Sequence, residues 1–146
     1  MLLIAVERAV PADLPQIEAL LATAGLPLDG AGRAFETGVV AREGVAVVGA
    51  AAVERYGSAG LLRSVVVAAH RRDAGIGRRL VAAAETLARD LGVRDLYLLT
   101  ETAIDWFPRL GYQVIPRDRA AAAVGQSIEL TTACATTAVT MHRELA

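Results

Sequence analysis

The stretch Arg72-Asp73-Ala74-Gly75-Ile76-Gly77 lies between an apolar run at 61–67 and a helical pattern that begins near Gly75. Such an arrangement predicts a strand that enters a tight glycine turn, and a turn that opens a helix. The first turn of a helix carries unpaired backbone N–H groups and the positive end of the helix dipole. Glycine lets this backbone approach a phosphate group closely, and Arg72 adds a positive charge. The stretch therefore predicts a cradle for an anion.

Three phosphate-binding motifs compete for this stretch. A P-loop ends in Gly-Lys-Ser/Thr, but the chain contains no lysine and Gly77 is followed by Arg78. A dinucleotide fingerprint needs a third glycine where Leu80 stands. The remaining pattern is Arg-x-x-Gly-x-Gly/Ala, and the segment from Val65 to Leu80 resembles the coenzyme A loop of the GNAT N-acetyltransferases. An ordinary strand-to-helix turn with a surface arginine is the alternative.

Composition fits a compact enzyme, and the length predicts one domain over residues 1–146. The resemblance implies that this is a single GNAT acetyltransferase domain. The net charge of −1 gives no general attraction to nucleic acid or to anionic membranes. No apolar stretch has the length of a membrane span. The single cysteine, Cys134, excludes an internal disulfide and a cysteine-based zinc site, which fits a reducing cytoplasm. No histidines and acids stand at ligand spacing, so no metal is expected.

Hydrophobic periodicity predicts an α/β chain with a mixed central sheet of six to seven strands flanked by helices. The expected strands are 2–8, 38–42, 45–56, 61–67, 93–100, 112–115 and 136–145. The expected helical segments are 13–24, 28–35, 76–91, 103–110 and 126–133. Asp13 is expected to cap the first helix, with Gln16 in the capping-box position. The strand-helix-strand crossover at 61–100 implies parallel neighbouring strands.

The resemblance to GNAT enzymes extends over nearly the whole chain. Residues 100–112 are similar to the family signature Asn-x-x-Ala-x-x-Phe-Tyr-x-x-x-Gly-Phe/Tyr, and the matching positions are Ala103, Gly111 and Tyr112. Thr100 replaces the usual asparagine, and Trp106-Phe107 replaces Phe-Tyr. The resemblance implies the GNAT fold, in which strands four and five splay apart.

Within the superfamily, the chain most resembles the small arsenic-resistance N-acetyltransferases, and it shares parts of its pattern with the acetyltransferase domain of N-acetylglutamate synthases. The stretches that carry this resemblance are 62–67, 96–100 and 128–141. It implies transfer of an acetyl group from acetyl-CoA to the amino group of a small anionic amino acid or analogue, such as an arsenic- or phosphorus-containing glutamate analogue. A homodimer through the last strands is a further expectation from the family.

The resemblance also places the co-substrate. The pantetheine arm is expected to pair with strand-four backbone, and the Val67 N–H to face the thioester oxygen. The residues implied in acetyl-CoA binding are Val65, Val66, Val67, Arg72, Asp73, Ala74, Gly75, Ile76, Gly77, Arg78, Thr100, Ala103 and Phe107.

Phe107 stands where the family has a tyrosine acid, and phenylalanine has no proton to donate. We therefore expect no dedicated tyrosine acid. Positioning of the substrates and polarisation of the thioester carbonyl are expected to supply much of the rate enhancement instead. Candidate bases are Glu54, Glu101 and His70, each of which is alternatively a solvated surface group. His142 is expected to be structural.

Arg63 is a charged residue inside an apolar strand, which is costly unless it is paired or partly exposed. It is either a fork that grips an acceptor anion or the partner of an acid such as Glu54. In the first case Ser64 and Thr100 are secondary acceptor contacts. Two other functions stay open, namely acetylation of protein or peptide N-termini and a non-catalytic module that binds acyl-CoA.

Overall fold

The computed structural model describes residues 3–72, 74–130 and 137–145. Its seven-stranded sheet has the order β1-β2-β3-β4-β5-β7-β6. The strands are β1 (Ile4–Arg8), β2 (Gly38–Glu43), β3 (Ala46–Tyr56), β4 (Ala59–Val67), β5 (Asp95–Thr100), β6 (Gln113–Val114) and β7 (Val139–Glu144). Among the described strands, only β4 and β5 pair in parallel, as the crossover predicts; the other neighbours are antiparallel.

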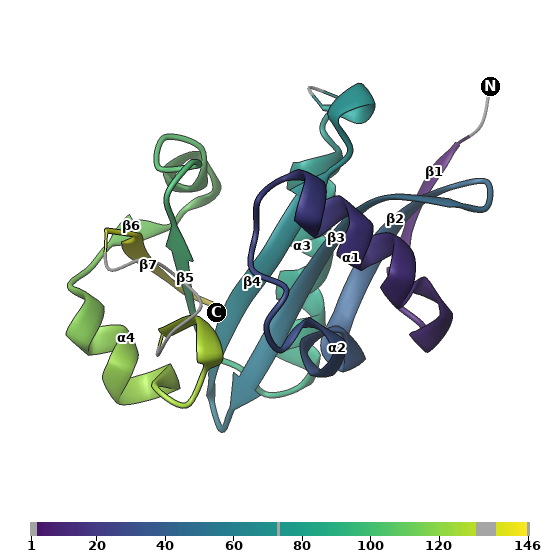
Figure 1. The fold of residues 1–146 in the computed structure, drawn as a ribbon. Helices are drawn as coiled ribbons and strands as arrows, with labels where there is room; N and C mark the ends of the chain where they lie inside the picture. Colours follow the sequence, from purple (N-terminus) through teal and green to yellow (C-terminus); the bar gives the residue numbers. More distant parts are fainter. Residues whose placement is uncertain (1–2, 73, 131–136, 146) are drawn as a thin grey trace.

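Helices cover both faces of the sheet (Figure 1). The α-helices are α1 (Leu14–Thr23), α2 (Ala31–Ala34), α3 (Ile76–Asp90) and α4 (Arg117–Val124). The 3-10 turns are η1 (Pro11–Asp13), η2 (Phe35–Thr37), η3 (Ala69–Arg71) and η4 (Phe107–Leu110). In Figure 1, α1 and α2 lie in front of the sheet and α3 lies behind it.

Strand β3 connects the two layers of core because its side chains alternate between the faces of the sheet. Ala50 and Ala52 pack in the cluster formed with α1 and α2. Ala51 and Val53 pack in the larger cluster that contains the apolar face of α3. Both faces are therefore buried along this strand, which explains its nearly continuous apolar sequence.

Three expectations need correction. The short helix expected at 103–110 is helical only from Phe107, as η4, and α4 was not predicted. Asp13 makes no side-chain cap on α1. Its carboxylate instead accepts the Val10 N–H at 2.9 Å and pairs with Arg42 at 2.9 Å. Gln16 likewise accepts the Val47 N–H at 2.9 Å and so ties α1 to β3.

Other expectations fall partly outside the described residues. These are Asp73, Cys134 and the end of the helical turn expected at 126–133. Within the ranges that the structure describes, no helix is long and apolar enough to cross a membrane.

Candidate active site

An opening separates β4 from β5 beyond their first paired residues. The two strands pair only from Ala59 to Leu61, opposite Asp95 to Tyr97. Farther along, β4 has a bulge against β3, where Ala52 pairs with Arg63 but Ala50 pairs with Val66. Ser64, at this bulge, has a φ of 58° and is the single non-glycine residue with positive φ among those described. The splay of strands four and five is thus present, and the bulge at Ser64 lies in the part of β4 that does not pair with β5.

The opening leads into a cleft of about 780 Å³. Most of the residues predicted for acetyl-CoA lie on its wall: Val65, Val66, Val67, Arg72, Gly75, Ile76, Gly77, Arg78, Thr100, Ala103 and Phe107. Arg63, Ser64 and Glu101 line it as well. Ala74 is exposed but is not part of the wall, and Asp73 lies outside the described residues. Glu54 lines a second, smaller cavity of about 430 Å³.

The two loop glycines meet different surroundings. Gly75 is the N-cap of α3 with a φ of 75°, and a Cβ built on it meets nothing within 4 Å. Its constraint is therefore the left-handed backbone, which favours glycine. A Cβ on Gly77 would lie 3.2 Å from the ring of Trp106, so Gly77 is needed for close packing. Arg72 donates from Nε to the Val67 carbonyl oxygen at 3.2 Å and thereby closes the turn.

The loop after β5 forms the opposite wall of the cleft. The hydroxyl of Thr100 accepts the Ala103 N–H at 3.0 Å, so this side chain shapes the turn. Glu101 is exposed, and the Thr137 hydroxyl donates to it at 3.2 Å. Phe107 is 6% exposed and packs edge-on against Trp106. The family's tyrosine position is thus occupied by a core aromatic ring without a hydroxyl.

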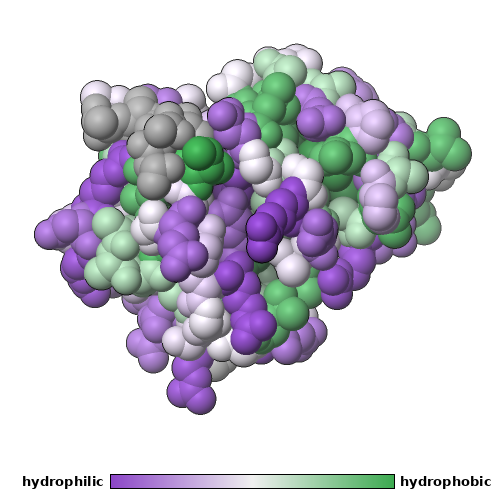
Figure 2. Space-filling model, turned by 60° about the horizontal axis from the view of Figure 1, so that its bottom comes forward, coloured by the Kyte–Doolittle hydropathy of each residue, from purple (hydrophilic) through white to green (hydrophobic). Residues whose placement is uncertain are grey.

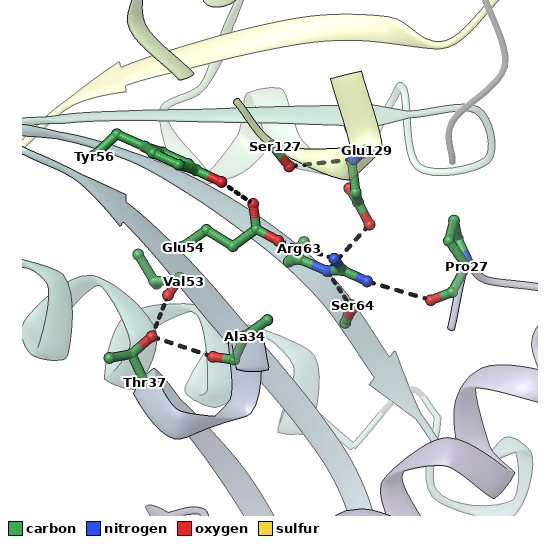
Figure 3. Close-up of polar contacts among 10 residues, drawn as sticks. All are labelled: Pro27, Ala34, Thr37, Val53, Glu54, Tyr56, Arg63, Ser64, Ser127 and Glu129. Carbon is green, nitrogen blue, oxygen red and sulfur yellow. Dashed lines mark hydrogen bonds and ion pairs between the residues drawn. The ribbon is translucent and has the colours of Figure 1, made fainter. Parts of the chain in front are cut away.

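Arg63 lies at the centre of a buried polar cluster (Figure 3). Its Nη1 donates to Glu54 at 2.9 Å, and its Nε lies 3.0 Å from the Ser64 hydroxyl and 3.3 Å from Glu129 Oε2. Its Nη2 makes a longer contact, 3.5 Å, with the Pro27 carbonyl oxygen. The Arg63 side chain is 0% exposed. The ion pair with Glu54, one of the two alternatives for Arg63, is therefore formed.

Tyr56 extends this cluster on the side of the second cavity. Its hydroxyl donates to Glu54 at 2.8 Å. Burial, together with the hydrogen bond to the Glu54 carboxylate, raises the pKa of Tyr56 to about 12. The phenol therefore remains a hydrogen-bond donor over the physiological pH range.

The other two tyrosines do not line the cleft. Tyr112 is buried, and its hydroxyl donates to Glu85 at 2.8 Å, while Arg143 pairs with the same Glu85 oxygen. Burial and the neighbouring Glu85 carboxylate raise the pKa of Tyr112 far above its ordinary value. Burial, more than any neighbouring charge, also raises the pKa of Tyr97. These directions oppose ionisation in both residues.

Neither histidine belongs to a group of metal-ligating side chains among the described residues. His70 is exposed beside the loop. His142 lies 2.8 Å from Asp95 and packs against the Tyr97 ring, in keeping with a structural role. Among the described residues, no three histidine, cysteine or acidic side chains are grouped to hold a metal ion.

Sequence reasoning missed three members of the site. Glu129 and Trp106 line the cleft, as does Arg71, which pairs with Glu43 at 2.6 Å and fastens η3 to β2. The signal for Trp106 was available, because it occupies the first aromatic position of the second signature. The roles of Glu129 and Arg71 depend on contacts between residues far apart in the sequence, which no local pattern encodes.

Comparison with solved structures gives the same architecture at low sequence identity. N-acetylglutamate synthase from Neisseria gonorrhoeae, complexed with coenzyme A and N-acetyl-glutamate, superposes with a TM-score of 0.83 at 21% identity. The match covers 100% of this chain but 36% of that one, so the present chain spans about a third of the synthase.

Two smaller proteins match over nearly their whole length. Rv2747 from Mycobacterium tuberculosis, in complex with CoA and NLQ, gives a TM-score of 0.78 at 23% identity, covering 97% of this chain and 99% of that chain. An acetyltransferase of the GNAT family from Staphylococcus aureus gives 0.81 at 13% identity, covering 99% and 100%. At these identities the likeness concerns the fold.

Family membership comes from the sequence model of the GNAT acetyltransferase domain, which matches residues 34–114. This range is more than half of the chain and includes β4, the glycine turn, α3 and the aromatic η4. The chain therefore belongs to the GNAT acetyltransferase family.

Proposed function

We propose that this enzyme acetylates the amino group of a small anionic amino acid or amino-acid analogue, including arsenic- or phosphorus-containing analogues of glutamate. The observation that carries the proposal is the buried Arg63 beside the cleft, one bulge away from the valines expected to hold the pantetheine arm. A guanidinium matches a carboxylate or a related oxyanion in a bidentate geometry. The similar synthase binds N-acetyl-glutamate, which is consistent with such an acceptor.

In this proposal acetyl-CoA lies along β4 with its pyrophosphate at the start of α3. The first turn of α3 offers unpaired N–H groups and the positive end of the helix dipole, and Arg72 and Arg78 add positive charge. Farther in, the pantetheine arm replaces the strand pairing that β4 and β5 lack beyond Leu61.

The backbone of Val67 is proposed to polarise the thioester carbonyl. The neighbouring Ala68 N–H donates to the Val48 carbonyl oxygen at 2.7 Å and hence points toward β3. Because backbone groups alternate in direction along a strand, the Val67 N–H points toward the opening. A donor at that place stabilises the negative charge that develops on the thioester oxygen during attack by the amine.

Glu101 is the better placed of the two acidic base candidates. It is exposed on the cleft wall, from which it accepts a proton from the acceptor ammonium directly or through one water. Glu54 lines the second cavity, and its two oxygens accept bonds from Arg63 and Tyr56. We therefore propose Glu101 as base and assign Glu54 to holding Arg63.

The proposal is tested by measuring thiol release from acetyl-CoA with a panel of acceptors. The panel contains L-glutamate, its phosphinic and arsinic analogues, an uncharged arylamine and a short peptide with a free N-terminus. We expect the highest kcat/KM with an acceptor that carries an additional anionic group. A preference for the peptide or the arylamine would contradict the proposed acceptor, and thiol release with none would favour a binding module.

A further inference from the structure

Ser64 holds a backbone conformation that is costly for a residue with a Cβ. Its φ is 58°, in the left-handed region that favours glycine. It belongs to the bulge of β4, in which Ser64 and Val65 together stand opposite Ala51 of β3. Bulges next to functional sites re-aim side chains, and local strain persists where the surrounding structure holds it in place. A serine in this conformation therefore points to a role for its hydroxyl.

The Ser64 hydroxyl connects the buried Arg63 to the main cleft. Arg63 donates from Nε to the Ser64 oxygen at 3.0 Å (Figure 3). Ser64 is 8% exposed and lines the main cleft. A hydroxyl that accepts such a bond keeps its own proton to donate, and among the described residues Ser64 donates to none. This proton is therefore available to a ligand in the cleft.

The Arg63 guanidinium itself is enclosed by other groups of the protein. Its Nη1 donates to Glu54 at 2.9 Å, its Nη2 contacts the Pro27 carbonyl oxygen at 3.5 Å, and its Nε also lies 3.3 Å from Glu129. The side chain is 0% exposed. A route from Nε through the Ser64 hydroxyl carries the influence of this charge into the cleft while all of these contacts stay in place.

The second cavity faces a different side of Arg63. Figure 2 shows the end of the molecule that carries the β3–β4 turn, where hydrophilic residues gather across the middle of the surface. The second cavity is lined by the exposed side chains of Arg33, Glu36 and Arg55, whose charges are screened by water. On this side Glu54 already pairs with the guanidinium. The Ser64 side, at the main cleft, is therefore where a ligand senses Arg63.

We propose that Ser64 donates its hydroxyl proton to the anionic group of the acceptor, and that Arg63 acts on the acceptor through this bond. This inference rests on the proposed function and names the group of that site which meets the acceptor anion. The Arg63 Nε–H polarises the Ser64 hydroxyl and so strengthens it as a donor. A hydrogen bond to an ionised oxygen is about twice as strong as one between neutral groups. An anion is thereby favoured over an uncharged group of the same shape.

The test compares L-glutamate and L-glutamine, which have nearly the same shape and differ in side-chain charge, and adds the phosphinic analogue of glutamate as a second anionic acceptor. Thiol release from acetyl-CoA gives kcat/KM for each acceptor with wild type and Ser64→Ala. We expect Ser64→Ala to lower kcat/KM for the anionic acceptors at least about tenfold, as for loss of a hydrogen bond to a charged group. The value for L-glutamine should fall less than about threefold, because a bond between neutral groups contributes less. KM for acetyl-CoA should stay within about twofold of wild type, because the variant keeps the β4 backbone.

Ser64→Gly separates the hydroxyl from the backbone strain. Glycine adopts a φ of 58° without steric cost, so this variant should unfold at a higher temperature than Ser64→Ala. Both variants lack the hydroxyl and should lose the same kcat/KM toward the anionic acceptors. Ser58→Ala is the matched control, because Ser58 is exposed, precedes β4 and lines neither of the two cavities. It should behave as wild type.

Arg63→Lys keeps the positive charge but lacks the Nε–H that Ser64 accepts. It should lower kcat/KM for the anionic acceptors in wild type and add less than about twofold in Ser64→Ala, because residues that act through one bond are not additive. Additive losses would overturn the inference by showing that Arg63 acts on the acceptor without Ser64. The comparison of Ser64→Ala with Ser64→Gly decides the matter even where Arg63→Lys does not fold.

Two other outcomes would also overturn the inference. Equal losses with L-glutamate and L-glutamine would show that Ser64 does not recognise charge. A loss in Ser64→Ala that Ser64→Gly restores would show that the backbone, and not the hydroxyl, matters. Wild type without a preference for anionic acceptors would instead contradict the proposed function on which the inference rests.

Discussion

At the scale of single residues, the phenylalanine at position 107 offers no hydroxyl to protonate the leaving thiolate of the proposed reaction. Phe107 is buried between Trp106 and Tyr112 in edge-on ring contacts. Tyr112 gives its hydroxyl to Glu85, and neither Tyr112 nor Tyr97 lines the cleft. A phenol whose pKa is raised by burial is also a weaker acid. In the proposed mechanism, positioning of the substrates and backbone polarisation of the thioester therefore supply the rate enhancement.

We accordingly predict that Tyr97→Phe and Tyr112→Phe each lower kcat by less than about tenfold, below the ~10²–10⁴-fold contribution typical of general acid catalysis. Tyr112→Phe should instead lower the free energy of unfolding by about 1–3 kcal/mol, because buried Glu85 loses a donor. Steady-state kinetics and urea denaturation measure the two effects. A hundredfold loss of kcat in a folded variant with unchanged KM would show that a tyrosine acid acts from another position.

The residues of the site differ in how far sequence reveals them. Arg63 was recognisable because a charge inside an apolar strand needs an explanation. The positions proposed for the cofactor were predicted from a motif whose glycines have defined backbone roles. Glu129 gave no such signal, because a single acidic residue outside any regular hydrophobic pattern does not stand out in a sequence. Only the structure shows its contact with Arg63.

At the scale of elements, the glycine turn and α3 act as one unit. Gly75 supplies the left-handed residue at which the chain turns into the helix, and Gly77 lets Trp106 pack against the helix start. The two glycines of the motif are therefore constrained for different reasons. Gly75 is constrained by its positive φ, and Gly77 by the closeness of the Trp106 ring. The sequence motif predicts their presence but does not separate these causes.

We predict that Gly75→Val and Gly77→Val both abolish measurable acetyl-CoA binding while the domain stays folded. Valine at Gly75 opposes the φ of 75°, at a cost of about 1–2 kcal/mol or more, and shifts the first turn of α3. Valine at Gly77 displaces Trp106 from the cleft wall.

Gly92→Val is the matched control, because Gly92 has a φ of 86°, meets nothing within 4 Å and lies just beyond the opposite end of α3. It should lose comparable stability but keep wild-type affinity in calorimetric titration. Wild-type affinity in the Gly75 and Gly77 variants would refute the assignment of the cradle.

Elements with a strong hydrophobic periodicity were predictable from the sequence. Elements whose buried and exposed faces differ little in hydrophobicity were not. The regular apolar face of α3 identified the helix, since its buried residues recur at helical spacing. In α4 only Ala120 and Val124 are buried, and the alanines beside them carry little contrast between faces. Asp13 had the expected capping composition, but the nearby Arg42 guanidinium took its carboxylate and lowers the pKa of Asp13 below its ordinary value. In this case a tertiary contact prevailed over a local one.

At the scale of the whole molecule, the sheet is weakest where the chemistry is proposed to occur. Strands β4 and β5 pair over the short segment 59–61, and the core cluster that contains the apolar face of α3 continues across the break. On the other face, Leu61 packs with Ala120 and Val124 of α4. The molecule therefore keeps β4 and β5 in one core while leaving the edge of β4 open.

Acetyl-CoA seated in this opening should complete the missing pairing, and we predict a directional pattern of hydrogen-exchange protection. The Val67 amide, which points toward the opening, should become protected when acetyl-CoA binds. The Val66 amide should change little, because it lies on the same edge as the Ala68 N–H, which donates to β3.

Saturation with acetyl-CoA at about 100 times Kd should also stabilise the fold by about 2.7 kcal/mol and raise Tm by roughly 5–10 °C. Amide exchange followed by NMR, with free pantetheine as the ligand that lacks the pyrophosphate, separates the two parts of the site. Pantetheine should protect Val67 only at much higher concentration, because it cannot use the start of α3. Equal protection of Val66 and Val67 would indicate general tightening of the fold, and protection of neither at saturation would place the pantetheine arm away from β4.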